Sequence, residues 1–182
     1  MTDSMAATAT YTRTAIALHW LIAGLIVCAF ALGWVMTDLA LSPMKLRMFN
    51  WHKWVGISVL GLAALRGTWR LIHAAPPSLP MPAWQRIAAQ LVHVALYVLM
   101  FAQPLSGWIY SNAAGYPIVY LGVLPLPNLV AKNKELAQSW MEVHETLALA
   151  LCAIIALHAL AALKHHFIDR DATLKRMLSW RN

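Results

Sequence analysis

One segment decides the fold: HETLALALCAIIALHALAALKHHF, which occupies residues 144–167. It carries no formal charge from Thr146 to Leu163, and a bilayer core needs about 20 helical residues, so it predicts a membrane-spanning helix. His144 and His158 lie 14 residues apart in it, which turns a helix through about 1400°, within about 40° of four whole turns. We therefore expect both side chains on one helix face, about 21 Å apart along the axis.

Three further apolar segments predict three more spans. Together the four spans are expected at residues 14–37, 51–72, 87–110 and 139–167. The composition agrees, because 60% of the 182 residues are hydrophobic and only 12% are charged, far from the balance of a soluble domain. We predict an all-α fold: an integral membrane four-helix transmembrane bundle in contact with lipid, forming a single membrane domain over residues 1–182.

Charged residues outside the apolar segments predict the orientation. The net charge is +7, but the basic residues flank uncharged segments instead of clustering on a polar surface, which argues against a nucleic-acid partner. Nine basic residues are expected on the side of both termini: Arg13, Arg66, Arg70, Arg86, Lys164, Arg170, Lys175, Arg176 and Arg181. Five are expected on the other side: Lys45, Arg47, Lys53, Lys132 and Lys134. Positive residues favour the cytoplasm, so both termini are predicted to be cytoplasmic, with a basic interfacial helix at residues 168–182.

Four histidines fall at two matching depths of the predicted bundle. His19 lies six residues after Arg13 in the first span, and His158 lies six residues before Lys164 in the fourth. Both are therefore expected near the cytoplasmic surface. His52 and His144 begin the second and fourth spans, so they are expected to share the opposite, outer depth.

Paired histidines at these depths favour haem as the ligand. Two neutral imidazoles from facing helices form a good axial set for haem iron, and bundle cores commonly house such cofactors. A separation of about 21 Å along a helix suits two stacked haems and is far too long for a dinuclear metal site. No CxxCH motif occurs, so neither haem is expected to be covalently attached.

Other readings of the histidines stay open. A lone intramembrane histidine can simply hydrogen-bond a neighbouring helix, and a histidine-lined transporter is a further alternative, although the spans hold almost no carboxylates to continue a proton path. His93 also reaches the cytoplasmic depth, so it either replaces His19 as the partner of His158 or packs nearby, which we favour. His165 is expected at the cytoplasmic mouth, where a haem propionate or a quinone carbonyl would meet it. His73 and His166 are expected to be structural.

Four segments give the chain a resemblance to a known family. They are IALHW at residues 16–20, NWHKWVGISVLGLAALRGTWRL at 50–71, HETLA at 144–148 and LHALAALKHHF at 157–167. In this order and spacing they resemble the bacterial cytochrome b561 family of dihaem membrane proteins over nearly the whole chain. The resemblance implies that His19 and His158 ligate one haem b and that His52 and His144 ligate the other. Arg13 and Arg66 are the candidates for contacts to haem propionates or quinone.

The resemblance also implies an activity. Members of this family oxidise superoxide and pass the electrons to ubiquinone, so the chain is expected to be a superoxide:ubiquinone oxidoreductase of the inner (cytoplasmic) membrane. His165 and Trp20 are the candidates for the quinone site. Superoxide is expected to be attracted by basic side chains at the outer depth, namely Lys45, Arg47 and Lys53. The alternative function is a haem-bearing electron-relay subunit that links a periplasmic redox partner or a dehydrogenase to the quinone pool.

Overall fold

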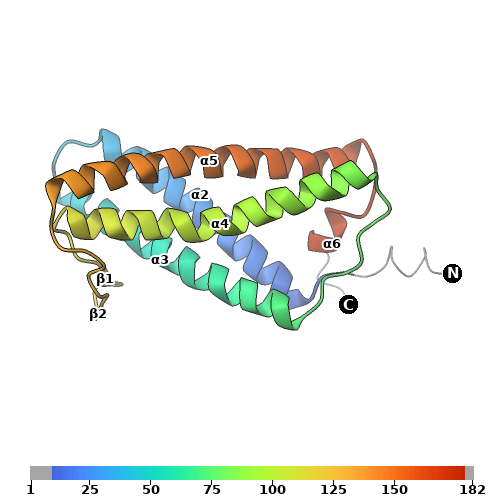
Figure 1. The fold of residues 1–182 in the computed structure, drawn as a ribbon, viewed down its shortest axis with the longest axis horizontal. Helices are drawn as coiled ribbons and strands as arrows, with labels where there is room; N and C mark the ends of the chain where they lie inside the picture. Colours follow the sequence, from blue (N-terminus) through green and yellow to red (C-terminus); the bar gives the residue numbers. More distant parts are fainter. Residues whose placement is uncertain (1–9, 179–182) are drawn as a thin grey trace.

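Four long helices make up most of the computed structural model, which describes residues 10–178. They are α2 (Arg13–Asp38), α3 (Pro43–Ile72), α4 (Ala83–Ala113) and α5 (Lys134–Phe167). Each is long and apolar enough to cross a membrane, which confirms the predicted helical bundle of four spans. Two short strands, β1 (Val119–Tyr120) and β2 (Leu124–Pro125), pair antiparallel between α4 and α5 (Figure 1).

The helices begin earlier than the apolar segments alone indicate. Helix α3 begins at Pro43, where the Ser42 hydroxyl accepts a hydrogen bond from the Lys45 amide at 3.2 Å. Helix α5 begins at Lys134, where Asn133 Oδ1 accepts from the Leu136 amide at 3.0 Å. Side-chain caps of this kind, with proline at the first helical position, start a helix wherever they occur. Hydropathy locates the apolar centre of a span but not these polar first turns.

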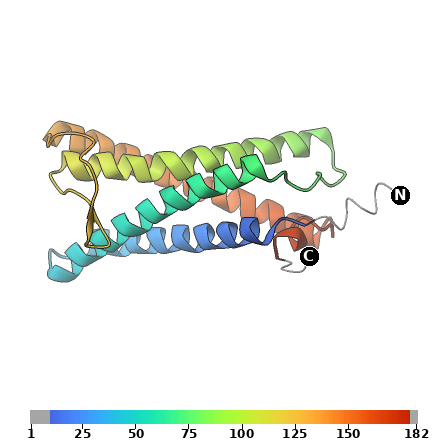
Figure 2. The same ribbon diagram turned by 90° about the horizontal axis from the view of Figure 1, so that it is seen from below.

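The four helices form two antiparallel helix pairs, α2 with α3 and α4 with α5, which meet where α3 contacts α4. Helix α2 packs along α3, α4 packs along α5, and α3 also contacts α4. Figure 2 shows α3 running obliquely, beside α2 at one end of the bundle and approaching α4 at the other. The buried core lies where the helices meet, and it consists of Ile22, Ile26, Val59, Ala63, Leu99, Met100 and Leu151.

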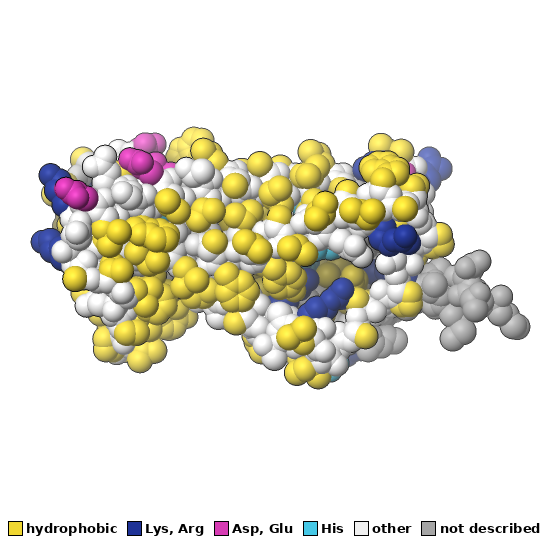
Figure 3. Space-filling model, in the orientation of Figure 1, with side chains coloured by type: hydrophobic (Ala, Val, Ile, Leu, Met, Phe, Trp, Pro, Cys, Tyr) yellow, Lys and Arg dark blue, Asp and Glu magenta, His cyan; other side chains and the backbone are white. Residues whose placement is uncertain are grey.

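Most apolar side chains face outward. Trp34 is 78% exposed and Leu71 is 89% exposed, and hydrophobic atoms cover much of the flank in Figure 3. Lysine and arginine atoms lie at the two ends of this face and in a recess near one of them (Figure 3). An apolar flank of this extent is unfavourable in water and is the surface that lipid covers.

The bundle has two distinct ends. The end that we call the α6 end holds the start of α2, the end of α5 and the short helix α6 (Lys175–Leu178) (Figure 1). The opposite end, which we call the hairpin end, holds the β-hairpin of β1 and β2 (Figure 1). At the hairpin end, the Trp54 indole donates to the Val119 carbonyl at 2.8 Å, and Ser58 Oγ lies 2.8 Å from the Tyr120 hydroxyl. These bonds fix the β-hairpin to α3.

The C-terminal tail folds back onto the bundle. The helix predicted for residues 168–182 is present only as α6 within the described residues; residues 179–182, including Arg181, lie outside them. Arg176 is 6% exposed and donates from Nη1 to the Pro77 carbonyl at 2.8 Å. The Trp20 indole donates to the Met177 carbonyl, also at 2.8 Å. The turn after α5, with Arg170 at a positive φ of 56°, interrupts the helix and redirects the chain.

Replacing Trp20 with Phe is expected to loosen this tail. The change removes the indole N–H that binds the Met177 carbonyl and keeps an apolar ring. A hydrogen bond of this kind contributes about 1 kcal/mol, so tryptic cleavage at Lys175 and Arg176 in detergent should become up to about fivefold faster. Trp34→Phe is the control, since Trp34 faces outward and its indole makes no hydrogen bond within the described residues. Equal cleavage rates in both variants would contradict the prediction.

Candidate functional site

The two histidines predicted for the outer depth meet at the hairpin end. His52 on α3 and His144 on α5 have ring centroids 6.1 Å apart with an interplanar angle of 82°. Nδ1 of His52 lies 2.9 Å from the Ala29 carbonyl, which can only accept, so Nδ1 carries the proton and Nε2 keeps its lone pair. Nδ1 of His144 likewise lies 3.1 Å from the Gln103 carbonyl. Both rings are thus in the tautomer whose Nε2 can bind a metal.

Three histidines meet at the α6 end. His19 on α2 and His158 on α5 have ring centroids 6.2 Å apart with an interplanar angle of 71°. His93 on α4 approaches the same His158 ring more closely, at 5.5 Å. The structure therefore brings together both residues that the sequence left as candidate partners of His158.

The centroid distances can be compared with the needs of a metal ion. A metal–imidazole bond is about 2 Å long, so two imidazoles on opposite sides of one ion have centroids about 6 Å apart. The His52–His144 and His19–His158 separations of 6.1 and 6.2 Å match this value. The His93–His158 separation of 5.5 Å is shorter. The donor chemistry and spacing of the first two pairs fit axial ligation of haem iron.

A cationic cavity of about 110 Å³ adjoins the histidines at the α6 end. Its lining includes Arg66, Arg70, His93 and Tyr97. Arg66 donates from Nη1 to the Ala15 carbonyl at 2.8 Å, which holds its guanidinium against the start of α2. Guanidinium groups in such a setting are suited to carboxylates, of which a haem propionate is one. Arg13, the other residue assigned to this role, is exposed and does not line the cavity.

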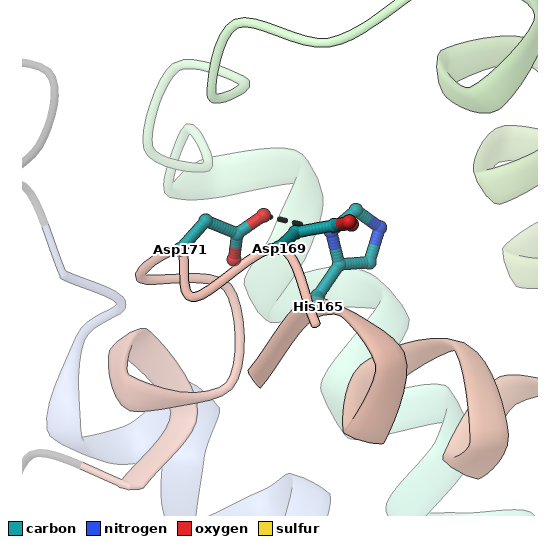
Figure 4. A group of neighbouring side chains, drawn as sticks. All are labelled: His165, Asp169 and Asp171. Carbon is teal, nitrogen blue, oxygen red and sulfur yellow. Dashed lines mark hydrogen bonds and ion pairs between the residues drawn. The ribbon is translucent and has the colours of Figure 1, made fainter. Parts of the chain in front are cut away.

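The residues considered for quinone already make hydrogen bonds to the tail. His165 lies 2.7 Å from Asp171 and 3.1 Å from Asp169, measured from its Nδ1 to a carboxylate oxygen of each (Figure 4). The Trp20 indole N–H is bound to the Met177 carbonyl. The described tail therefore occupies the ring nitrogen Nδ1 of His165 and leaves Nε2.

Among the described residues outside the spans, Asp171 is the one whose pKa is shifted, and the shift is downward. Burial raises the pKa of Asp171, but hydrogen bonds from Thr173 and His165 lower it by more, so the net shift is downward. The Thr173 amide lies 2.7 Å from Asp171 Oδ1. Asp169 also pairs with Lys164, at 2.7 Å. The sequence analysis assigned no role to Asp169 and Asp171. Their position just after a helix whose last turn holds Lys164, His165 and His166 is nevertheless a recognisable charge pattern.

The basic residues expected to attract superoxide do lie on the first turns of α3, at the hairpin end. Lys45 donates from Nζ to the Leu39 carbonyl at 2.6 Å and so caps the end of α2. Arg47 is exposed, and Lys53 is partly buried beside His52. Two further functional candidates, Gln103 and Ser106, contact His144 from α4 and were missed, because polar residues inside a span give no signal of the helix they face.

Four apolar helices with a histidine pair near each end fit the class of membrane-embedded four-helix cytochromes. A family model described as prokaryotic cytochrome b561 matches residues 10–180, and the chain belongs to that family. It is therefore a membrane b-type cytochrome, a multi-pass bacterial membrane protein that binds b-type haem and takes part in electron transfer. This confirms the resemblance found in the sequence.

Curated relatives cover nearly the whole chain. Cytochrome b561 homolog 2 of Escherichia coli is 38% identical over 166 residues, which is 89% of this chain and 87% of the relative. Cytochrome b561 homolog 1 of the same organism is 34% identical over 92% of this chain and 96% of its own length. A Yersinia pestis protein named "probable superoxide oxidase CybB" is 30% identical over 92% of this chain and 95% of its own length.

Asp171→Asn is expected to destabilise the α5 end in a pH-dependent way. Because the folded pKa is lowered, ionised Asp171 contributes stability above the pKa of the unfolded chain, and this is lost as the pH falls through the folded pKa. We expect the melting temperature in detergent to fall by about 2–4 °C at pH 7, as a loss of about 1 kcal/mol would give. The difference from wild type should vanish as the pH drops through the folded pKa. Asp38→Asn is the control, and an equal effect there would contradict the role of Asp171.

Proposed function

We propose that this cytochrome carries two haems b and transfers electrons across the inner membrane from superoxide to ubiquinone. The observation that carries the proposal is the presence of two imidazole pairs, 6.1 and 6.2 Å apart, near opposite ends of one bundle. The relative named as a probable superoxide oxidase supports the choice of electron donor. Haem iron, when bound, supplies reversible one-electron chemistry at each pair.

In this proposal each pair of histidines has a fixed assignment. His52 and His144 hold the outer haem, and His19 and His158 hold the inner one. The 6.2 Å separation supports His19 over His93 as the partner of His158, since 5.5 Å leaves less room than two metal–imidazole bonds require. His93 then packs against the ligand and lines the adjoining cavity. Both termini, and with them the α6 end, lie on the cytoplasmic side.

Substrates reach the two ends by different routes. Two superoxide anions in turn approach the hairpin end, where Lys45, Arg47 and Lys53 provide positive charge. Each would give up one electron and leave as dioxygen, so two of them supply the electrons for one ubiquinone. Ubiquinone is reduced at the α6 end, where it takes up two electrons and two protons to become ubiquinol. Because Asp171 accepts from Nδ1 of His165, the Nε2 atom is the one left to face the quinone, where its lone pair would accept a hydrogen bond from a hydroxyl of the product ubiquinol. Arg66 would bind a haem propionate from the cavity, and Arg13 and Trp20 are assigned to the same end.

The relay function named from the sequence stays a prediction. A haem subunit serving a periplasmic partner or a dehydrogenase would need a docking surface for that protein. Neither the described residues nor the names of the relatives identify one. The relative named as a probable superoxide oxidase favours superoxide as the electron donor.

The proposal predicts about two b-haems per chain and superoxide-driven reduction of ubiquinone. His144→Ala and His158→Ala should each lower the haem content from about two to about one, because each removes one axial ligand of a different pair. His166→Ala is the matched control and should keep both. Haem is quantified by the reduced-minus-oxidised spectrum, and quinol formation is followed during enzymatic superoxide generation with and without superoxide dismutase. A haem-loaded protein that forms no dismutase-sensitive quinol is not a superoxide oxidase.

A second pair of variants decides the partner of His158. His19→Ala is expected to lose the inner haem, whereas His93→Ala is expected to keep both haems with bis-histidine, low-spin spectra. Electron paramagnetic resonance of the oxidised proteins separates low-spin from high-spin iron in each variant. The reverse pattern would assign His93 as the ligand.

A further inference from the structure

Each hairpin-end histidine rests on the preceding helix in the same manner. His52 on α3 lies against α2 at Gly33, and its Nδ1 donates to the carbonyl of Ala29 at 2.9 Å. His144 on α5 lies against α4 at Gly107, and its Nδ1 lies 3.1 Å from the carbonyl of Gln103. In both cases the glycine comes four residues after the residue whose carbonyl is used. The two helix hairpins thus repeat one seating arrangement.

The spacing of four residues has a physical reason. In an α-helix the carbonyl of residue i bonds the amide of residue i+4 and keeps a second lone pair. The side chain of residue i+4 leans toward the helix N-terminus and covers the turn that holds this carbonyl. A glycine at i+4 leaves the carbonyl open to a ring from another helix. The pairs Ala29–Gly33 and Gln103–Gly107 meet this condition.

The two seats differ in how tightly the ring is held. A Cβ added at Gly107 would stand 2.9 Å from Cε1 of His144, a distance that real Cβ atoms essentially never show, and 3.1 Å from its Nδ1, so the imidazole would have to move. A Cβ at Gly33 would stand 3.4 Å from Cε1 of His52, close to ordinary contact. A Cβ at Gly24 or Gly61 would meet nothing within 4 Å. Among the helical glycines, only those at positions 33 and 107 therefore face a histidine.

The His144 seat has additional polar contacts that the His52 seat lacks. Ser106 is 1% exposed; its hydroxyl lies 3.0 Å from His144 Nδ1 and donates to the Gln103 carbonyl at 2.8 Å. The Gln103 side-chain amide nitrogen lies 3.2 Å from His144 Nε2 and donates to the lone pair that iron would use, so this amide would turn aside when haem binds. Two oxygen atoms next to Nδ1 fix the proton there and make the ring a stronger electron donor through Nε2. Two groups on α4 therefore set both the orientation and the basicity of His144.

We propose that Gly107, together with the Gln103 carbonyl and Ser106, positions His144 as an axial ligand of the hairpin-end haem. Gly33 and the Ala29 carbonyl position His52 in the same way but with more space. These are positioning residues, which act through the two histidines and not by contact with substrate. The inference rests on the proposed binding of haem by the histidine pairs.

The test compares three alanine substitutions: at Gly107, which leaves little space beside His144; at Gly33, which leaves more space beside His52; and at Gly24, which contacts no histidine. Full-length Gly107→Ala is expected to lose the hairpin-end haem, so that haem falls from about two to about one per chain while the α6-end spectrum remains. Gly33→Ala is expected to keep both haems and to shift the midpoint potential of the hairpin-end haem alone. Gly24→Ala should match wild type in haem content and in both potentials. Helix content by circular dichroism is compared across all three.

Ser106→Ala is the second variant, because it removes a hydrogen-bonding hydroxyl without adding any atom next to His144. It is expected to retain both haems and to raise the midpoint potential of the hairpin-end haem, because a less basic imidazole stabilises the oxidised iron less. His144→Ala and His158→Ala assign the two potentials. Should Gly107→Ala fail to accumulate, the Ser106→Ala potential decides alone. Wild-type potentials in Ser106→Ala, or two unperturbed haems in Gly107→Ala, would overturn the inference. A wild-type protein without two haems would instead overturn the proposed function.

Discussion

The two imidazoles of each pair stand on different helix hairpins, so the distance between them depends on how far α2 and α3 lie from α4 and α5. That distance is set mainly where α3 contacts α4, and by a small core of aliphatic side chains such as Ile26, Val59 and Leu99. In lipid the hydrophobic effect does little to draw helices together, so packing and interhelical hydrogen bonds determine the spacing. The bonds from His52 and His144 to carbonyls of α2 and α4 are contacts of this kind within each hairpin. His52 and His144 therefore contribute both to the histidine pair and to the packing of the helices within each pair.

The sequence predicted the four spans, and it predicted which histidines would lie near one another, because both follow from local rules. Uncharged length predicts a spanning helix, and counting residues from a charged end places His19 level with His158. What it did not predict depends on contacts between distant segments. The seat of His144 on Gly107 requires the relative rotation of α4 and α5, which no single helix encodes. The folding of the tail onto Trp20 and Pro77 likewise depends on two separate parts of the chain.

The α6 end combines features that bear on both cofactor and substrate. A cationic cavity with Arg66 and Arg70 opens beside His93, and the tail adds carboxylates that hold His165. The hairpin end has no comparable carboxylate cluster around its histidines in the part of the chain that the structure describes. This asymmetry fits the two substrates that we propose, a small anion at one end and a quinone that needs protons at the other. Membership of the cytochrome b561 family places both within electron transfer.

Helix α5 carries one histidine of each pair, with His144 ten residues after its first residue and His158 nine residues before its last. Leu151 lies midway between them in the chain, is 4% exposed and belongs to the core. A rigid helix that is packed at its middle can tilt about that point. If α5 tilts about Leu151, the two imidazoles move in opposite directions across the bundle, so one pair widens as the other is displaced. A tilt of α5 would therefore couple the positions of His144 and His158, although about 21 Å of helix separates them.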